Sequence, residues 1–317
     1  PVSEPRDTLR PLGLGGGLTA LLLSALWGGN VVSAKLALGT FAPFWTAFWR
    51  MSVGLAPVLL WARKRHTSLW PQPRERRWLT YLGILMTVQI SLVYLGVSFT
   101  SAGFAAVLMN SHPIFTNFIS HFFVPGDQLS WPRLIGLVTA FSGISATFLG
   151  RPEARLASRP LAGNLLCTAT SALFAARTVF TSRIVARIDY VRTVFWQTVI
   201  TIPFYLLAAL ALEPMTLQPV TWKALAALAY QGFMSNGVCT ILWIRLLRNH
   251  RPGEVAIFGF PAPIFGVTFS AMMFAEKLSP ALLVGVAAVA AGIFIVTRDR
   301  AQREMPSPPA QIRGAPS

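Results

Sequence analysis

A few polar side chains interrupt long apolar stretches of this chain, and their types could bind a solute. Asn30 and Arg177 lie within about two helical turns of the middle of two such stretches. A cation at membrane depth is costly and by default suggests function. A guanidinium binds carboxylates, and an amide can both donate to and accept from a zwitterion. Hydrogen bonds between helices, or snorkelling of Arg177 towards Arg183, remain alternatives.

Prolines predict breaks in two matching stretches. Residues 109–113 read MNSHP and residues 259–263 read GFPAP. Because proline removes a backbone donor and frees a carbonyl, backbone groups could meet a substrate there. A packing kink is the alternative. The predicted helix breaks at the site are Pro113, Pro261 and Pro263.

His112 lies in the first predicted break and is the central group that titrates near neutral pH. A hydrogen bond between helices is favoured over a proton relay. Lys35 is expected at the external rim, and Arg50 is expected to have a structural role. Gln197 and Gln231 are further amides inside the apolar stretches.

Aromatic residues and amides at similar depth could line a path for the solute. Such aromatic residues more often face lipid or core, so this alternative stays open for each of them. The candidate substrate-binding residues are Asn30, Arg177, Trp27, Gln89, Tyr94, Asn110, His112, Trp196, Tyr230, Asn236 and Phe260.

The composition around these residues predicts an integral membrane protein. Of 317 residues, 54% are hydrophobic and 12% are charged, whereas soluble domains are about 25% charged. Both cysteines lie inside apolar runs, which excludes a disulfide framework. The apolar runs are continuous rather than alternating, which predicts an all-α fold and not a barrel. Ten stretches have the length of a membrane-spanning helix, at about 14–37, 43–62, 78–98, 101–124, 131–150, 161–184, 191–212, 221–244, 254–275 and 279–297.

Basic residues are unevenly divided between the connectors. Nineteen Lys and Arg fall on the side that holds both termini, and five fall on the other side. This bias predicts that both termini are cytoplasmic. The net charge of +16 is therefore interpreted as topology signals and lipid contacts, not nucleic-acid binding. Residues 1–13 are expected to form a cytoplasmic N-terminus, and 298–317 a disordered cytoplasmic tail.

The two halves of the chain repeat each other. SALWGGN at 24–30 aligns with SALFAAR at 171–177, and HPIF at 112–115 aligns with APIF at 262–265. Each half, 14–150 and 161–297, carries five predicted spans, so the second half enters the membrane from the opposite side. Inverted repeats are typical of alternating-access transporters, with the substrate near the midplane. A duplicated structural membrane protein is the alternative.

Several segments resemble the EamA-type repeats of the drug/metabolite transporter superfamily. They are SALWGGN, FWRMSVG, AGFAAVLMNSHPIF, GEVAIFGFPAPIF, AEKLS and GVAAVAAGI. The resemblance covers about 14–297 and is greatest to bacterial aromatic amino-acid exporters of the YddG type. It implies a ten-helix transporter. Small proton-driven cation exporters similar to this superfamily rely on a membrane-embedded Glu that is missing here, which disfavours cationic drugs and a carboxylate proton carrier.

The chain lacks the patterns GxxxxGK[ST], HExxH and GxSxG, so neither an enzyme nor a cofactor or metal is expected. The expected function is export of small neutral or zwitterionic metabolites, most of all amino acids, by facilitated diffusion across a bacterial inner membrane. An anionic-metabolite or nucleotide-sugar carrier remains open, as does a membrane enzyme or structural protein. The expected partners are a small solute and the lipid bilayer. The oligomeric state is left open, a monomer included.

Overall fold

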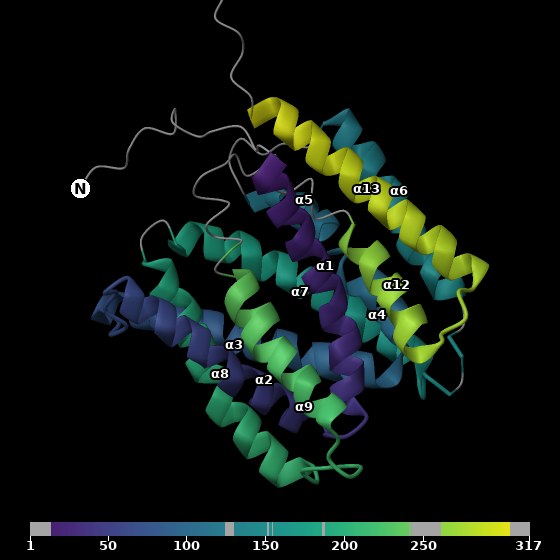
Figure 1. Ribbon diagram of the computed structural model, residues 1–317. Helices are drawn as coiled ribbons and strands as arrows, with labels where there is room; N and C mark the ends of the chain where they lie inside the picture. The colour runs from purple at the N-terminus through teal and green to yellow at the C-terminus, as the bar shows by residue number, and fades with distance from the viewer. Residues whose placement is uncertain are drawn as a thin grey trace, which may run out of the picture.

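The protein is described by a computed structural model covering residues 14–123, 130–150, 152–153, 155–185, 188–240, 242 and 261–304. In these residues the regular structure is helical, and the single β contact is an isolated bridge between Phe41 and Thr216. The helices, shown in Figure 1, are α1 (Leu14–Leu38), α2 (Pro43–Lys64), α3 (Pro73–Phe99), α4 (Ala102–Met109), α5 (His112–Phe123), α6 (Trp131–Leu149), α7 (Pro160–Val185), α8 (Tyr190–Leu212), α9 (Trp222–Ala229), the π-helix η2 (Tyr230–Val238), α12 (Ala262–Phe274) and α13 (Pro280–Glu304).

Each predicted span contains a helix of this series. The fourth span is divided into α4 and α5, and the eighth continues from α9 into η2. By length and composition alone, α1, α3 and α8 are long and apolar enough to cross a membrane. Side chains mark several starts: Ser130 caps α6, Asp189 caps α8 and Thr221 caps α9 by accepting backbone N–H bonds.

The last helix corrects one predicted boundary. The sequence predicts a disordered tail from residue 298, but α13 continues as a helix to Glu304. Asp299 explains part of this extension, because it accepts hydrogen bonds from Arg133 Nε at 3.0 Å and Ser130 Oγ at 2.7 Å, both at the start of α6. Residues 305–317 and 1–13 lie outside the described residues.

Helices from the two halves pack in matching pairs. α1 contacts α12, and the corresponding pair is α7 with α4 and α5; α2 contacts η2, and the corresponding pair is α8 with α3. The fifth helices of the halves, α6 and α13, lie side by side along one flank of the molecule (Figure 1). Close approach there depends on glycine, since a Cβ on Gly292 would lie 2.5 Å from the Gly136 carbonyl oxygen.

Polar contacts at the helix ends give the helix directions. Lys35, in the last turn of α1, donates to the carbonyl oxygens of Val97 at 2.8 Å and Thr100 at 2.6 Å, at the end of α3. The start of α7 lies at the same level, because Thr100 Oγ1 donates to Asn164 Oδ1 at 2.7 Å. Near the other end of α7, Phe180 packs on Trp78 in the first turns of α3. α7 is thus antiparallel to α3, and α1 ends where α3 ends.

The π-helix η2 is a feature that the sequence analysis missed. It packs closely against α2: a Cβ on Gly232 would lie 2.7 Å from Val53 Cβ, and one on Gly237 would lie 2.0 Å from Pro57 Cγ. π-helical turns are rare and are often found at functional sites. Here the wider helix carries Gln231 and Asn236 towards α1, α2 and α3.

Candidate functional site

The break in the fourth span lies between α4 and α5. Asn110 ends α4, and its Nδ2 donates back to the Ala106 carbonyl at 2.8 Å. The freed carbonyls are taken by serines: Ser111 Oγ donates to Leu108 O at 2.6 Å, and Ser171 Oγ of α7 donates to Met109 O at 3.0 Å. The break is therefore held by serine side chains on both sides of the interface with α7.

His112, Phe174 and Arg177 form a cluster beside this break. The His112 and Phe174 rings have centroids 4.5 Å apart, and the Arg177 guanidinium carbon lies 5.1 Å from the centre of the Phe174 ring. Arg177 Nη1 donates to Gln197 Oε1 of α8 at 2.8 Å. Its Nε is buried and finds no hydrogen-bond partner among the described residues.

Arg50 supplies a second buried guanidinium. It lies on α2, is 8% exposed and stands next to the Tyr94 phenol of α3. Its Nε also lacks a partner within the described chain. Arg50 of α2 and Arg177 of α7 are close enough for their charges to interact.

Tyr94 connects this region to the π-helix. Its hydroxyl donates to Gln231 Oε1 at 2.6 Å, and Gln231 Nε2 donates to the Ser33 carbonyl of α1 at 3.2 Å. Tyr94 is 1% exposed and Gln231 is fully buried. One hydrogen-bonded chain thus crosses α3, η2 and α1 next to Arg50.

Acidic side chains are absent from the middle of the described helices. The acids that the structure describes lie at helix ends or in connectors: Glu75, Glu153, Asp189, Glu213, Glu276, Asp299 and Glu304. The central arginines therefore have no carboxylate of this part of the chain beside them, and the region is electropositive.

Further polar atoms in the interior also lack partners among the described residues. Asn30 Oδ1 and Gln89 Oε1 are acceptors without a donor, and Asn236 Nδ2 is a donor without an acceptor. Buried polar groups almost always make a hydrogen bond, so each such atom needs an explanation. Like the two arginine Nε atoms, they are buried polar atoms whose hydrogen-bonding capacity the described chain leaves unused.

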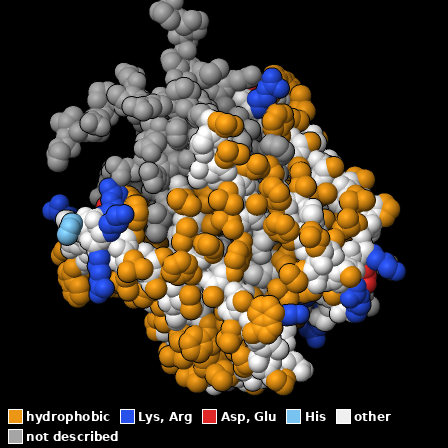
Figure 2. Space-filling view, in the orientation of Figure 1, with side chains coloured by type: hydrophobic (Ala, Val, Ile, Leu, Met, Phe, Trp, Pro, Cys, Tyr) orange, Lys and Arg blue, Asp and Glu red, His pale blue; other side chains and the backbone are white. Residues whose placement is uncertain are grey.

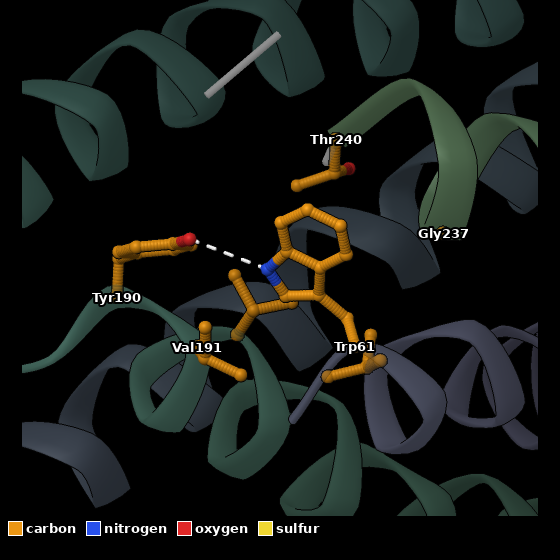
Figure 3. A pocket seen from close by; sticks show the side chains of 7 residues that line it. Trp61, Tyr190, Val191, Gly237 and Thr240 are labelled. Atoms are coloured by element: carbon orange, nitrogen blue, oxygen red, sulfur yellow. Dashed lines mark hydrogen bonds between the residues drawn. The ribbon is translucent and has the colours of Figure 1, made fainter. Parts of the chain in front are cut away.

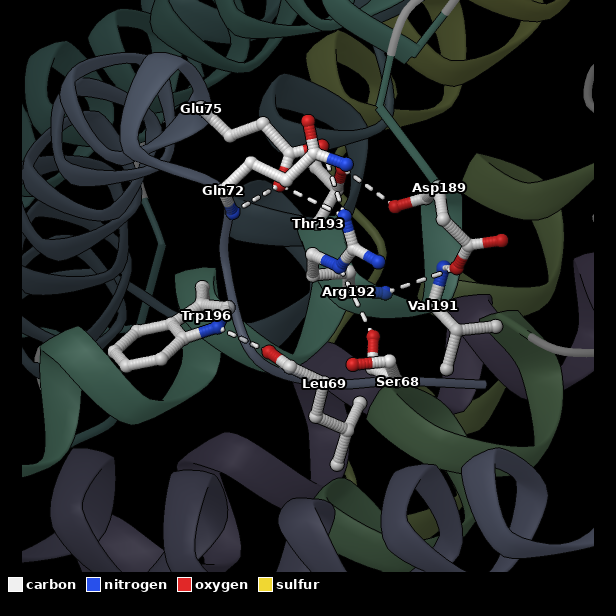
Figure 4. A network of polar contacts seen from close by, with 9 residues as sticks. All are labelled: Ser68, Leu69, Gln72, Glu75, Asp189, Val191, Arg192, Thr193 and Trp196. Carbon is white, nitrogen blue, oxygen red and sulfur yellow. Dashed lines mark hydrogen bonds and ion pairs between the residues drawn. The ribbon is translucent and has the colours of Figure 1, made fainter. Parts of the chain in front are cut away.

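The ends of the helices are tied together differently. Glu276, which follows α12 and is 4% exposed, accepts from Ser270 Oγ at 2.5 Å, Gly103 N at 3.0 Å and Ser101 Oγ. It thereby joins the end of α12 to the start of α4. At the opposite end, Arg192 Nη1 donates to both carboxylate oxygens of Glu75 at 2.8 Å, which joins α8 to α3 (Figure 4).

A small cavity lies between α2, α8 and η2 near the predicted cytoplasmic ends (Figure 3). Its volume of about 20 Å³ is far too small for a metabolite. Trp61 Nε1 donates to Tyr190 Oη across it at 3.3 Å. The lining residues are Val58, Trp61, Tyr190, Val191, Val194, Gly237 and Thr240.

The model of the EamA-like transporter family matches this chain twice, over residues 14–149 and 161–298. The chain belongs to the EamA-like transporter family. It is thus an integral membrane transporter and not an enzyme.

Relatives in other organisms carry names of the same kind. An uncharacterized transporter of Archaeoglobus fulgidus is 24% identical over 293 residues, covering 90% of this chain and 98% of the relative. A probable amino-acid metabolite efflux pump of Salmonella typhimurium is 24% identical over 293 residues, covering 88% and 93%. A protein of the same name in Escherichia coli is 23% identical over 292 residues. The narrower likeness to YddG-type exporters stays a prediction.

A solved crystal structure shares the fold. It aligns with a TM-score of 0.65 at 19% sequence identity, covering 91% of this chain and 97% of its own. At this identity the likeness supports the fold of the transporter and carries no information on its substrate.

The structure brings only part of the predicted site together. Tyr94 lies next to Arg50, and His112 packs in one cluster with Phe174 and Arg177. Trp196 lies elsewhere, because its Nε1 donates to the Leu69 carbonyl at 2.7 Å in the connector between α2 and α3 (Figure 4). Phe260 lies outside the described residues.

Two other predicted residues have partners between α1 and the eighth span. Tyr230 Oη donates to the Leu26 carbonyl of α1 at 2.6 Å. Trp27 packs against the buried cluster of Ala20, Leu23 and Cys239. Both connect α1 to the eighth span.

Proline positions agree in part with the predicted breaks. Pro113 is the second residue of α5, just after the observed break. Pro261 caps α12 and Pro263 lies in its first turn, while the chain before Pro261 is outside the described residues. From the sequence, Arg50 is expected to have a structural role, and Gln197 and Gln231 are further amides without an assigned role. Their partners lie on other helices, so no local signal could have selected them.

Proposed function

We propose that this transporter exports small zwitterionic metabolites, most of all amino acids, and binds the substrate carboxylate between Arg50 and Arg177. The observation that carries the proposal is the pair of buried guanidinium groups, each with an unpartnered Nε in the described structure. A charge-assisted hydrogen bond to a carboxylate would satisfy both.

The ammonium group of the substrate is assigned to amide oxygens. Asn30 Oδ1 and Gln89 Oε1 are buried acceptors that find no donor in the described chain. Neutral acceptors suit an ammonium group whose charge is balanced by the same molecule's carboxylate. They would not hold a free cation at this depth, where a buried charge needs an opposite charge.

The names of two relatives support this substrate class. The Salmonella typhimurium and Escherichia coli proteins are each named a probable amino-acid metabolite efflux pump. Each match covers 88% of this chain, so the aligned region spans the positions of both central arginines.

Transport is proposed to follow alternating access by two inverted five-helix repeats. The matched helix pairs and the opposite directions of α1 and α7 support this arrangement. Glu75 and Glu276 accept hydrogen bonds at opposite ends of the helices. These hydrogen bonds are proposed to break and re-form as the halves rock against each other. Both termini are proposed to be cytoplasmic, in a bacterial inner membrane.

Coupling to protons is not required in this proposal. The described acids lie at helix ends, so the described part of the membrane interior has no carboxylate to carry a proton. Facilitated diffusion down the substrate gradient is therefore proposed.

An anionic metabolite is a second candidate, and the same two arginines favour it. Without a nearby acid they could accept a second negative charge on the substrate, such as a phosphate. In that case the unpartnered amide acceptors would bind hydroxyl groups.

Counterflow in proteoliposomes tests the proposal and separates the candidates. Vesicles are loaded with unlabelled phenylalanine, threonine or methionine, and uptake of the labelled amino acid is followed, with phosphorylated sugars as the competing class. Accumulation that requires the unlabelled amino acid supports the proposal. Accumulation of sugar phosphates alone selects the second candidate, and no flux of either class by inserted protein contradicts both.

A further inference from the structure

One face at the start of α3 is both strongly basic and exposed. Arg74, Arg76 and Arg77 are exposed, as are Arg63, Lys64 and Arg65 at the end of α2. Figure 2 shows this group as the cluster of blue side chains, with one pale-blue histidine, at the left edge of the molecule.

The acid in this segment does not neutralise the cluster. Between residues 63 and 78 the single acidic residue is Glu75. Glu75 is 8% exposed and is held by Arg192 of α8, so its charge is already paired (Figure 4). Arg74 and Arg77, on either side of it, leave their charges on the surface.

The exposed face of α3 changes chemistry in the order of membrane depth. Positions 74, 77, 78, 81, 84 and 88 share one face of a helix at 3.6 residues per turn. Arginines come first, followed by Trp78 and Tyr81, which are 37% and 47% exposed. Ile84 and Val88 follow, at 53% and 47% exposed. Cation, aromatic ring and aliphatic side chain match headgroup, interface and hydrocarbon in turn.

The arginine nearest the rings is held in place by them. The guanidinium carbon of Arg77 lies 4.7 Å from the centre of the Trp78 ring. This stacking leaves the edges of the guanidinium free for oxygen acceptors and lowers the entropy lost on binding. Trp78 also packs on Phe180 of α7, with ring centroids 5.8 Å apart, which fixes its position.

We propose that Arg74 and Arg77 form a binding site for the headgroup of an anionic phospholipid, whose acyl chain lies along Trp78, Tyr81 and Ile84. The phosphate accepts hydrogen bonds from the two guanidinium groups, and the negative charge of the lipid balances the cluster. The site is independent of the substrate site and does not rest on the proposed substrate.

Native mass spectrometry of the full chain in detergent tests this site. The protein is titrated with phosphatidylglycerol, with phosphatidylcholine, and with glycerol 3-phosphate as a soluble headgroup. Wild-type protein is expected to retain phosphatidylglycerol in preference to phosphatidylcholine. The double substitution Arg74→Gln and Arg77→Gln is expected to weaken phosphatidylglycerol binding roughly thirtyfold, from the usual contribution of a basic residue near an anionic surface.

Two further variants make the result specific. Lys223→Gln with Lys277→Gln removes two exposed positive charges, at the start of α9 and after α12, on the predicted external side, and is expected to retain the lipid. Arg74→Lys with Arg77→Lys keeps the charge and is expected to retain most of the binding. The proposal is overturned if the Arg74→Gln, Arg77→Gln variant binds as wild type does, if the Lys223→Gln, Lys277→Gln control loses as much, or if glycerol 3-phosphate displaces the lipid at equal concentration.

Discussion

Charged residues at the ends of the helices and those at the centre are satisfied in different ways. At the ends, Glu75 pairs with Arg192, and Asp299 pairs with Arg133. At the centre, Arg50 and Arg177 keep Nε atoms that no described residue satisfies. The same cost of burying a polar group applies in both places. The described charges at the ends are paired within the protein, whereas the centre keeps donors that the proposed substrate would satisfy.

The largest effect on stability is expected at the end contact between α3 and α8. Glu75→Ala would leave Arg192 with most of its surface buried and without its carboxylate, at a cost of about 3–5 kcal/mol. Unfolding of the purified protein measures this cost. In a double-mutant cycle, Glu75→Ala with Arg192→Ala should cost clearly less than the sum of the single changes. Additive losses would mean that the two side chains do not act as a pair.

A smaller loss is expected where α2 meets the π-helix. In Gly54→Ala the new Cβ would lie 2.6 Å from Asn236 Nδ2 and 3.2 Å from the Gly232 carbonyl oxygen. Overpacking of this kind costs about 1–3 kcal/mol. Gly15→Ala is the matched control, because a Cβ there meets nothing within 4 Å. Equal thermal stability of the two variants would contradict the close approach of η2.

The hydrogen-bonded chain at the centre gives the next effect. Tyr94→Phe removes the donor to Gln231 Oε1 and leaves that oxygen buried, which is expected to cost about 1–2 kcal/mol. Tyr81→Phe, on the exposed face of α3, is the control and should change unfolding little. A Tyr94→Phe protein as stable as wild type would show that the hydrogen bonds linking α3, η2 and α1 contribute little to the free energy of unfolding.

The smallest effect is a pH dependence at the end of α8. Burial raises the pKa of the Glu213 carboxyl above its ordinary value, and the hydrogen bond from Phe44 N opposes that rise. The folded protein therefore binds this proton more tightly than the unfolded chain does. As pH rises from the ordinary value of 4.5 through the raised pKa, the free energy of unfolding should fall.

Thermal unfolding measured across this pH range in wild type and Glu213→Gln isolates the contribution. The glutamine variant should lack the part of the slope that comes from Glu213. A slope that is unchanged in Glu213→Gln would assign the pH dependence to other groups.

Much of the fold could be predicted, because the length of an apolar run can be seen directly in the local sequence. The runs around α1, α3 and α8 can be found from the sequence alone, and prolines and capping residues mark several helix starts. The π-helix was not predicted, and the close approach of its Gly232 and Gly237 to α2 arises only when segments far apart in the chain are packed.

The candidate site was harder to predict, because the position of a residue within its predicted span does not say towards which helix its side chain points. Trp196 and Gln197 are neighbours in sequence, yet Trp196 bonds to a connector while Gln197 bonds to Arg177. Arg50 is expected from the sequence to have a structural role, and its neighbour Tyr94 lies on another helix. Such partners become visible only when the helices are packed.

The central claim is that Arg50 and Arg177 bind the carboxylate of the substrate, and a paired change of protein and substrate tests it most directly. Counterflow by wild type, by Arg50→Gln and by Arg177→Gln is measured with an amino acid and with its amide, in which a neutral carboxamide replaces the carboxylate. Wild type should prefer the amino acid by roughly 10- to 100-fold, the value of a hydrogen-bonded charge at a buried site. Each arginine variant should lose most of that preference by transporting the amino acid more slowly. If both variants discriminate as wild type does, the carboxylate is bound elsewhere and the account of the centre is wrong.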